Sequence, residues 1–144
     1  MATFTRVEDI EAWQEARKLA TQIYKLTSVG DWARDFGLRD QIRRAAVSIA
    51  CNIAEGYARS SNLEFARFLA ISRASATEVK TQMYIALDLG YTDQQAFDVV
   101  YNDLDRICMK IMGLMKYLKS VQKTTSRAAS QPSTANRQPS TSKE

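Results

Sequence analysis

Arginine supplies the most distinctive chemistry in this sequence. Every basic residue between positions 34 and 73 is an arginine, although lysine occurs on both sides of this region. A guanidinium group is planar, always charged and able to bind a carboxylate or a phosphate through two hydrogen bonds. These arginines therefore either pair with carboxylates, holding helices and subunits in register, or also contact RNA phosphate. The candidate nucleic-acid-binding or partner-binding residues are Arg39, Arg43, Arg44, Arg59, Arg67 and Arg73.

Carboxylate and amide side chains lie among and after these arginines. Glu55, Glu64 and Glu78 could supply oxygen ligands for a cation, but carboxylates on helices more often cap an end or form ion pairs. Asn52 and Glu55 share one helix face and can satisfy backbone groups of a turn that Gly56 permits. We therefore interpret Asn52, Glu55, Gly56, Glu64 and Glu78 as structural motif residues, and we predict no metal site.

Several kinds of catalytic chemistry lack the residues they need. The chain has no histidine, which excludes Glu-x-x-His di-iron sites, histidine general bases and Ser/His or Cys/His nucleophilic pairs. None of its five glycines forms part of a phosphate-binding loop. Cys51 and Cys108 lie within apolar helical patterns, which favours packed thiols in a reducing compartment over a disulfide or a metal site. We predict a non-enzymatic protein without a cofactor.

Four amphipathic segments must position these residues. Their apolar positions recur at spacings of three and four: Ala12, Ala16, Leu19, Ile23 and Leu26; Ile42, Ala46, Ile49 and Ile53; Phe65, Leu69, Ser72, Ala76, Val79, Met83 and Ala86; Phe97, Val100, Leu104, Ile107, Ile111, Leu114 and Leu118. Turn signals separate them at 27–31, 56–62 and 89–93, and Thr92 with Gln95 predicts a capping box before the last helix. The pattern predicts an all-α fold, an antiparallel up-down-up-down four-helix bundle over residues 1–120, in which small residues let the second and third helices approach closely.

The last helix carries more apolar surface than one bundle core requires. A second stripe beside its core positions consists of Tyr101, Cys108, Met112 and Met115. An apolar stripe left over after the core is closed is typical of a contact with another subunit. We predict that this stripe is an oligomer interface.

The C-terminal residues 121–144 differ in composition from the rest. They are rich in Ser, Thr, Gln and Pro without apolar periodicity, which predicts a disordered tail rather than an arm that binds RNA or membrane. This tail carries most of the net charge of +4, so the body is nearly neutral and the basic pI is weak evidence for a polyanion partner. No apolar run is long enough to span a bilayer, and the N-terminus is acidic, so we expect a cytoplasmic protein without a membrane partner.

The same segments resemble a known family. The chain is similar to the small four-helix-bundle proteins that are encoded within intervening sequences of bacterial 23S ribosomal RNA genes. The similarity covers most of residues 7–93, through "VEDIEAWQEARKLATQIYKLT", "FGLRDQIRRAAVSIACNIAEGYAR", "EFARFLAISRASATEVKTQ" and "DLGYTD". The matching motif positions are Arg39, Arg43, Asn52, Glu55, Gly56, Arg59, Glu64 and Glu78. Two departures are visible. The family usually has Pro-Ser where this chain has Ala50-Cys51, which predicts a straighter second helix, and it usually has glycine where this chain has Ala74, which predicts slightly less room for helix packing.

The resemblance implies a partner as well as a fold. It implies a homo-oligomer that forms a five-fold ring, and distant kinship with the accessory variability determinant of retroelements, which binds nucleic acid and a reverse transcriptase. It supplies no catalytic residue. We therefore expect a non-enzymatic oligomeric accessory factor that binds RNA or an RNA-associated protein. The alternative is a purely structural self-assembling scaffold or protein-interaction module. A contiguous arginine strip would favour RNA, and one-to-one pairing of arginines with carboxylates would favour the scaffold.

Overall fold

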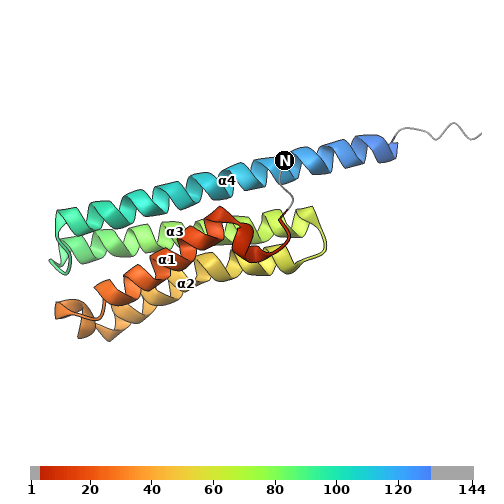
Figure 1. Ribbon diagram of the computed structural model, residues 1–144. Coiled ribbons are helices and arrows are strands. Elements are labelled where there is room, and N and C mark those ends of the chain that lie inside the picture. The colour runs from red at the N-terminus through yellow and green to blue at the C-terminus, as the bar shows by residue number, and fades with distance from the viewer. Residues whose placement is uncertain (1–3, 131–144) are drawn as a thin grey trace, which may run out of the picture.

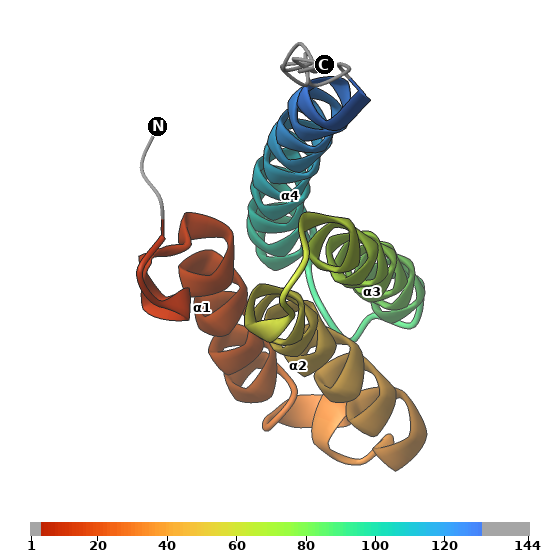
Figure 2. The same ribbon diagram turned by 90° about the vertical axis from the view of Figure 1, so that its right-hand side faces the viewer.

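The computed structural model describes residues 4–130, with side chains through Val121. Its main elements are four helices, α1 (Glu11–Leu26), α2 (Phe36–Ala58), α3 (Asn62–Asp88) and α4 (Gln94–Ser130), and two short 3-10 helices, Val7–Asp9 and Gly30–Ala33. Residues 4–130 contain no β-strand. Short connections make consecutive helices antiparallel, and the end-on view shows α1 to α4 following one another around the bundle (Figures 1 and 2). This confirms the predicted all-α four-helix bundle.

The core consists of the positions that the helical periodicity selects. Nearly all of the predicted apolar positions are buried, and only Leu26 and Leu114 are half-buried. Trp32, in the short helix before α2, is also buried although no periodic pattern includes it. Burial of apolar surface at about 25 cal/mol per Å² is the main force that holds the four helices together.

Side-chain caps determine where three of the helices begin. Asp35 accepts a hydrogen bond from the Leu38 amide at the start of α2, and Ser61 accepts one from the Glu64 amide at the start of α3, both at 3.1 Å. The cap of α4 is Asp93, whose carboxylate accepts from the Ala96 amide at 2.8 Å. The predicted capping box of Thr92 and Gln95 was therefore one residue too early. Thr92 is buried, and its hydroxyl donates instead to the Asp93 carbonyl.

Helices α2 and α3 pack closely because small residues line their contact. The Ser72 hydroxyl donates to the Ile49 carbonyl at 2.7 Å, and the hydroxyls of Ser48 and Ser75 lie 3.0 Å apart. The predicted close approach of these two helices is confirmed. The resemblance predicted slightly less room between these helices at Ala74. The Ala74 side chain is exposed, however, and does not reduce the space between them.

Gly56 marks the tightest point of this contact. A Cβ atom built there would lie 2.8 Å from Phe68 Cβ, 3.0 Å from Phe65 Cδ1 and 3.2 Å from the Phe65 carbonyl oxygen. Gly56 lies within α2, and positive φ angles occur instead at Gly30 and Gly90 (63° and 76°). The predicted turn at Gly56 was therefore wrong, because α2 continues to Ala58. The glycine provides room for the phenylalanines of α3.

Helix α4 is longer than the helices it packs against. It continues past Leu118, the last buried residue among the side chains described, to Ser130, so helix occupies positions 121–130, where composition predicts a tail. Nothing in this stretch interrupts a helix, since the first proline of the chain is Pro132. The end of α4 projects beyond the other three helices (Figure 1). The predicted tail residues 131–144 lie outside the described residues.

Polar bridges join the first helix to the last. The Lys110 ammonium donates to the carboxylates of Glu11 and Glu15 at 2.8 and 3.1 Å. The hydrogen bond from Lys110 lowers the pKa of Glu11, and the two carboxylates raise the pKa of Lys110. These exposed pairs fix the register of α1 against α4 but add little to stability, because solvent screens them.

Candidate interaction surfaces

Two of the candidate arginines hold together the segment that leads into α2. Arg39 donates to the Ala33 carbonyl at 3.0 Å and to Asp40 at 3.1 Å, and its guanidinium lies 4.7 Å from the centre of the Phe36 ring. Arg43 donates to the Thr27 hydroxyl at 2.8 Å and to the Ser28 hydroxyl at 3.1 Å.

The Arg43 guanidinium also covers the Tyr24 ring, 4.6 Å from its centre. Thr27 is buried, and its hydroxyl donates in turn to the Ile23 carbonyl at 2.7 Å. Arg43 thus satisfies groups at the C-terminus of α1, where a cation also interacts favourably with the helix dipole. Both Arg39 and Arg43 are engaged within the chain.

Arg59 and Arg67 flank one phenylalanine at the opposite end of the bundle. Each pairs with a carboxylate of its own helix region, Arg59 with Glu55 at 2.8 Å and Arg67 with Glu64 at 3.0 Å. Their guanidinium groups lie 5.0 and 4.8 Å from the centre of the Phe68 ring. This is one-to-one pairing of arginines with carboxylates, the arrangement expected of a scaffold.

Arg44 and Arg73 differ from the other four. Both are exposed, and the side chain of neither forms a hydrogen bond or ion pair with any residue that the structure describes. Arg44 belongs to α2 and Arg73 to α3. The six candidates therefore do not share a single role, since four are engaged within the chain and two are free to meet a partner.

The structural motif residues serve mainly their own helices. Asn52 donates to the Ser48 carbonyl and hydroxyl, both at 2.8 Å, one turn back along α2 rather than at its end. Glu78 accepts a long hydrogen bond of 3.5 Å from Gln82. Among the side chains that the structure describes, no three of Cys, Asp and Glu are grouped to hold a metal ion.

The predicted interface stripe on α4 is partly covered by α3. Tyr101 stacks on Phe97 at a centroid distance of 5.7 Å, and the Lys80 ammonium lies 4.8 Å from its ring centre while also pairing with Asp105. Cys108 and Met115 are half-buried, whereas Met112 is 51% exposed. Burial raises the pKa of the Cys108 thiol, although the charge of Lys80 opposes this rise.

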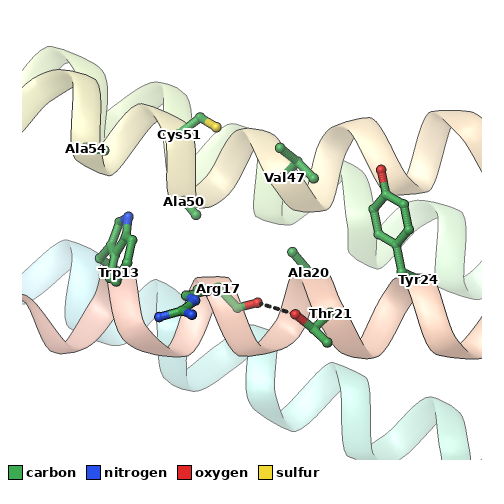
Figure 3. Close-up of a pocket in the computed structure, with 9 residues that line it drawn as sticks. All are labelled: Trp13, Arg17, Ala20, Thr21, Tyr24, Val47, Ala50, Cys51 and Ala54. Carbon is green, nitrogen blue, oxygen red and sulfur yellow. Dashed lines mark hydrogen bonds between the residues drawn. The ribbon is translucent and has the colours of Figure 1, made fainter. Parts of the chain in front are cut away.

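A groove between α1 and α2 is the surface that sequence reasoning missed. It has a volume of about 490 Å³ and is lined by Trp13, Arg17, Ala20, Thr21, Tyr24, Val47, Ala50, Cys51 and Ala54. Trp13 and Tyr24 extend from α1 toward α2 at its two ends, with alanines between them (Figure 3). The signal was present in α1, where positions 13, 17, 20 and 24 repeat at helical spacing beside the core stripe.

Comparison with known proteins decides the family. The profile of a family described as 23S rRNA-intervening sequence protein matches residues 8–113, which is most of the chain. The chain belongs to this family. The match confirms the resemblance seen in the sequence. The region that matches the 23S rRNA-intervening sequence proteins includes α1, α2, α3 and the part of α4 up to residue 113.

A solved structure shows the same fold. The chain is similar to a protein of unknown function from the S23 ribosomal protein family of Bacteroides thetaiotaomicron, with 22% sequence identity and a TM-score of 0.67. The match covers 73% of this chain and 98% of that one. No curated protein matched the chain. Within the described residues, no helix is both long and apolar enough to cross a membrane.

Proposed function

We propose that this protein is a non-enzymatic helical bundle that works by binding other proteins, beginning with copies of itself. The observation that carries the proposal is the presence of two apolar surfaces that the bundle leaves uncovered. One is the groove between α1 and α2. The other, called the methionine face, consists of Met109 and Met112 on α4, which are 73% and 51% exposed.

The groove has the shape of a receptor for side chains. Its volume of about 490 Å³ lies within the range of ligand-binding clefts, and aromatic rings form its two ends. Alanines at positions 20, 50 and 54 line it between these rings, so a partner helix can approach the backbone closely. An exposed apolar patch of this kind is typical of a protein interaction site.

The side chains of the methionine face are suited to fill the groove of another subunit. Methionine is unbranched and polarizable, fills irregular apolar gaps and makes favourable contacts with aromatic rings such as Trp13 and Tyr24. The face lies beside α3, because neighbouring α4 residues contact α3 through Lys80–Asp105 and Tyr84–Tyr101. It is therefore on the other side of the bundle from the groove between α1 and α2 (Figure 2).

Two different surfaces on opposite sides favour head-to-tail assembly. A contact between unlike surfaces of identical subunits forms a ring when the rotation closes. The five-fold ring expected from the resemblance is an assembly of this type. The local pairing of Arg39, Arg59 and Arg67 with carboxylates supports the self-assembling alternative over RNA binding through those arginines.

The mass in solution tests the proposal. Light scattering on the purified protein should report several times the chain mass of 16.2 kDa, and five times for a five-fold ring. Val47→Glu in the groove and Met112→Glu on the methionine face should each yield monomers. Val99→Glu is the matched control, because Val99 is 47% exposed on a different side of α4.

Mixing the two interface variants tests the head-to-tail geometry. Val47→Glu retains an intact methionine face, and Met112→Glu retains an intact groove. The mixture should therefore form a dimer of one chain of each and nothing larger. A wild-type monomer at micromolar concentration, or a Val99→Glu variant that dissociates as readily as the other two, would contradict the proposal.

A further inference from the structure

The groove between α1 and α2 contains one charged side chain. Arg17 lies between Trp13 and Ala20 along α1, and every other residue that lines the groove is uncharged (Figure 3). The guanidinium carbon of Arg17 lies 5.7 Å from the centre of the Trp13 ring, but the guanidinium forms no hydrogen bond or ion pair with any residue that the structure describes. Covering an unpaired charge is costly. A partner that fills the groove must therefore bring an anion to Arg17.

A carboxylate adjoins the methionine face on α4. Asp105 precedes Met109 by four residues and Met112 by seven, so at about 100° per residue the three side chains lie within a sector of about 60°. The Lys80 ammonium donates to Oδ1 of Asp105, but Oδ2 accepts no hydrogen bond from the described part of the chain. The Asp105 side chain is 49% exposed. The methionine face is therefore accompanied by an anion that has an acceptor available for a partner.

Two bridges between α1 and α4 show which positions of these antiparallel helices are level along the bundle. Glu15 pairs with Lys110 at 3.1 Å and with Arg106 at 3.9 Å, so it is level with the midpoint of these two α4 positions. Asp105 lies three residues before this midpoint, and Arg17 lies two residues after Glu15. Because the helices run in opposite directions and rise about 1.5 Å per residue, Asp105 and Arg17 differ in level by only about 1.5 Å.

Closure of a ring brings groups of equal level together. Identical subunits in a closed ring are related by rotation alone, without a shift along the rotation axis. The groove and α4 both run along the bundle, so a helix that lies lengthwise in the groove makes this axis roughly parallel to the helices (Figure 1). Groups that are level in one chain then meet between neighbours. By the same count, Trp13 is level with the stretch of α4 between Met109 and Met112, where a ring and sulfur atoms make favourable contacts.

We propose that Arg17 of each chain pairs with Asp105 of the neighbouring chain, and that this ion pair sets the register of the head-to-tail contact. The ion pair presupposes the proposed self-assembly and adds the groups that select a second copy of this chain as the occupant of the groove. The two groups are opposite in charge and nearly equal in level, and each has hydrogen-bonding capacity that the described chain does not use. Docked apolar surfaces exclude water around them, so salt screens the pair less than an exposed one.

The pair discriminates against wrong occupants of the groove. A copy that is shifted along the groove by about one helical turn places Met109 or Asn102, instead of a carboxylate, opposite Arg17 and leaves its charge unpaired. An acidic amphipathic helix of an unrelated protein is the competing occupant. Nothing in such a helix ties its anion to the level of Arg17, whereas the bridges between α1 and α4 do so for Asp105.

A pair of chains that can form only one contact tests the register. The Val47→Glu chain retains the methionine face and the Met112→Glu chain retains the groove, so their mixture contains a single kind of contact. Arg17→Glu, added to the groove-bearing chain, should raise the dissociation constant measured by isothermal titration calorimetry by about tenfold or more, because it places two carboxylates in contact. Asp105→Arg, added to the chain with the methionine face, should do the same by placing two cations in contact.

Combining the two changes gives the decisive measurement. The exchanged charges again attract each other, so the dissociation constant should be about tenfold or more below that of either single change. Because the changes lie on different chains, this recovery cannot arise from repacking within one chain, even though Asp105→Arg also removes the partner of Lys80. The control is Lys18→Glu on the groove-bearing chain, which reverses an exposed charge about 100° around α1 from Arg17 and should change the dissociation constant by less than about twofold.

Light scattering and circular dichroism on every chain show which of the two proposals fails. If the parent pair forms no dimer, the head-to-tail assembly is refuted and the ion pair with it. If the parent pair forms a dimer but the exchanged charges bring no recovery, or if Lys18→Glu weakens it as much as Arg17→Glu, the ion pair is refuted and the assembly stands. Recovery with both changes, in chains that keep the wild-type helical content, supports the ion pair.

Discussion

Replacement of Gly56 by alanine tests the close packing of α2 on α3. The new methyl group would lie 2.8 Å from Phe68 Cβ and 3.2 Å from the Phe65 carbonyl oxygen. Neither atom belongs to the flexible end of a side chain, so the clash cannot be relieved by a rotamer change alone. The two helices must move apart, which loosens the neighbouring contacts between them, including the Ser72 hydrogen bond.

Two opposing effects determine the magnitude. Forcing an extra carbon into a well-packed contact costs about 1–3 kcal/mol. Alanine regains up to about 1 kcal/mol over glycine within a helix, and less near the helix end where Gly56 lies. The net expectation is a loss of about 1–2 kcal/mol in the free energy of unfolding. For a bundle of this size that loss corresponds to a decrease in Tm of roughly 3–10 °C.

Gly113 provides the matched control for this substitution. It lies within α4, and a Cβ atom added there would meet nothing within 4 Å. Gly113→Ala should therefore raise the stability by about 0.5–1 kcal/mol through helix propensity alone. Thermal and urea unfolding of both variants by circular dichroism measure the difference. If Gly56→Ala is as stable as the wild type or more so, the close approach of the two helices is refuted.

Two further predictions concern neighbouring arginines and the two thiols. Arg43→Lys should lower the free energy of unfolding by about 1–2 kcal/mol, because lysine cannot replace the guanidinium group that contacts Thr27, Ser28 and the Tyr24 ring. In the same urea titration, Arg44→Lys should change the free energy of unfolding by less than about 0.5 kcal/mol. Equal losses would contradict this assignment. Burial raises the pKa of Cys108, so at pH 8 less of it is thiolate. In the monomeric Met112→Glu variant, whose groove has no occupant, a thiol reagent should therefore modify Cys108 much more slowly than Cys51. The slow phase should accelerate as the pH rises and disappear in urea, and a single fast phase in the native protein would refute this.

The spacing of apolar residues was sufficient to predict the helices, because an apolar stripe at helical spacing is visible in the sequence alone. The same was not true of Gly56. A glycine near the end of a helical pattern is equally consistent with a left-handed turn and with a close approach to a neighbouring helix. Only the position of Phe68 on α3 distinguishes these cases. The shift of the cap from Thr92 to Asp93 has a similar cause, since both residue types cap helices and their burial decides between them.

The roles of the arginines could be stated as alternatives but not resolved from the sequence. Arg43 and Arg44 are adjacent and chemically identical, yet they point in directions about 100° apart. One reaches the end of α1, and the other points to solvent. The groove between α1 and α2 could not be predicted, because its lining residues come from two helices whose relative position the sequence pattern does not give. The continuation of α4 over residues 121–130 was not predicted, because these residues have no apolar periodicity.

The connections between the helices also bear on the order in which the bundle folds. Only residues 59–61 separate α2 from α3, so the contacts around Gly56 and Ser72 join segments that are close in sequence. Closing such a short loop costs little entropy, and local contacts form early in folding. The bridge from Lys110 to Glu11 instead spans a separation of 99 residues. The α2–α3 hairpin is therefore the natural nucleus, and α1 docks on α4 last and detaches first, which should give its amides the fastest native-state hydrogen exchange of the bundle.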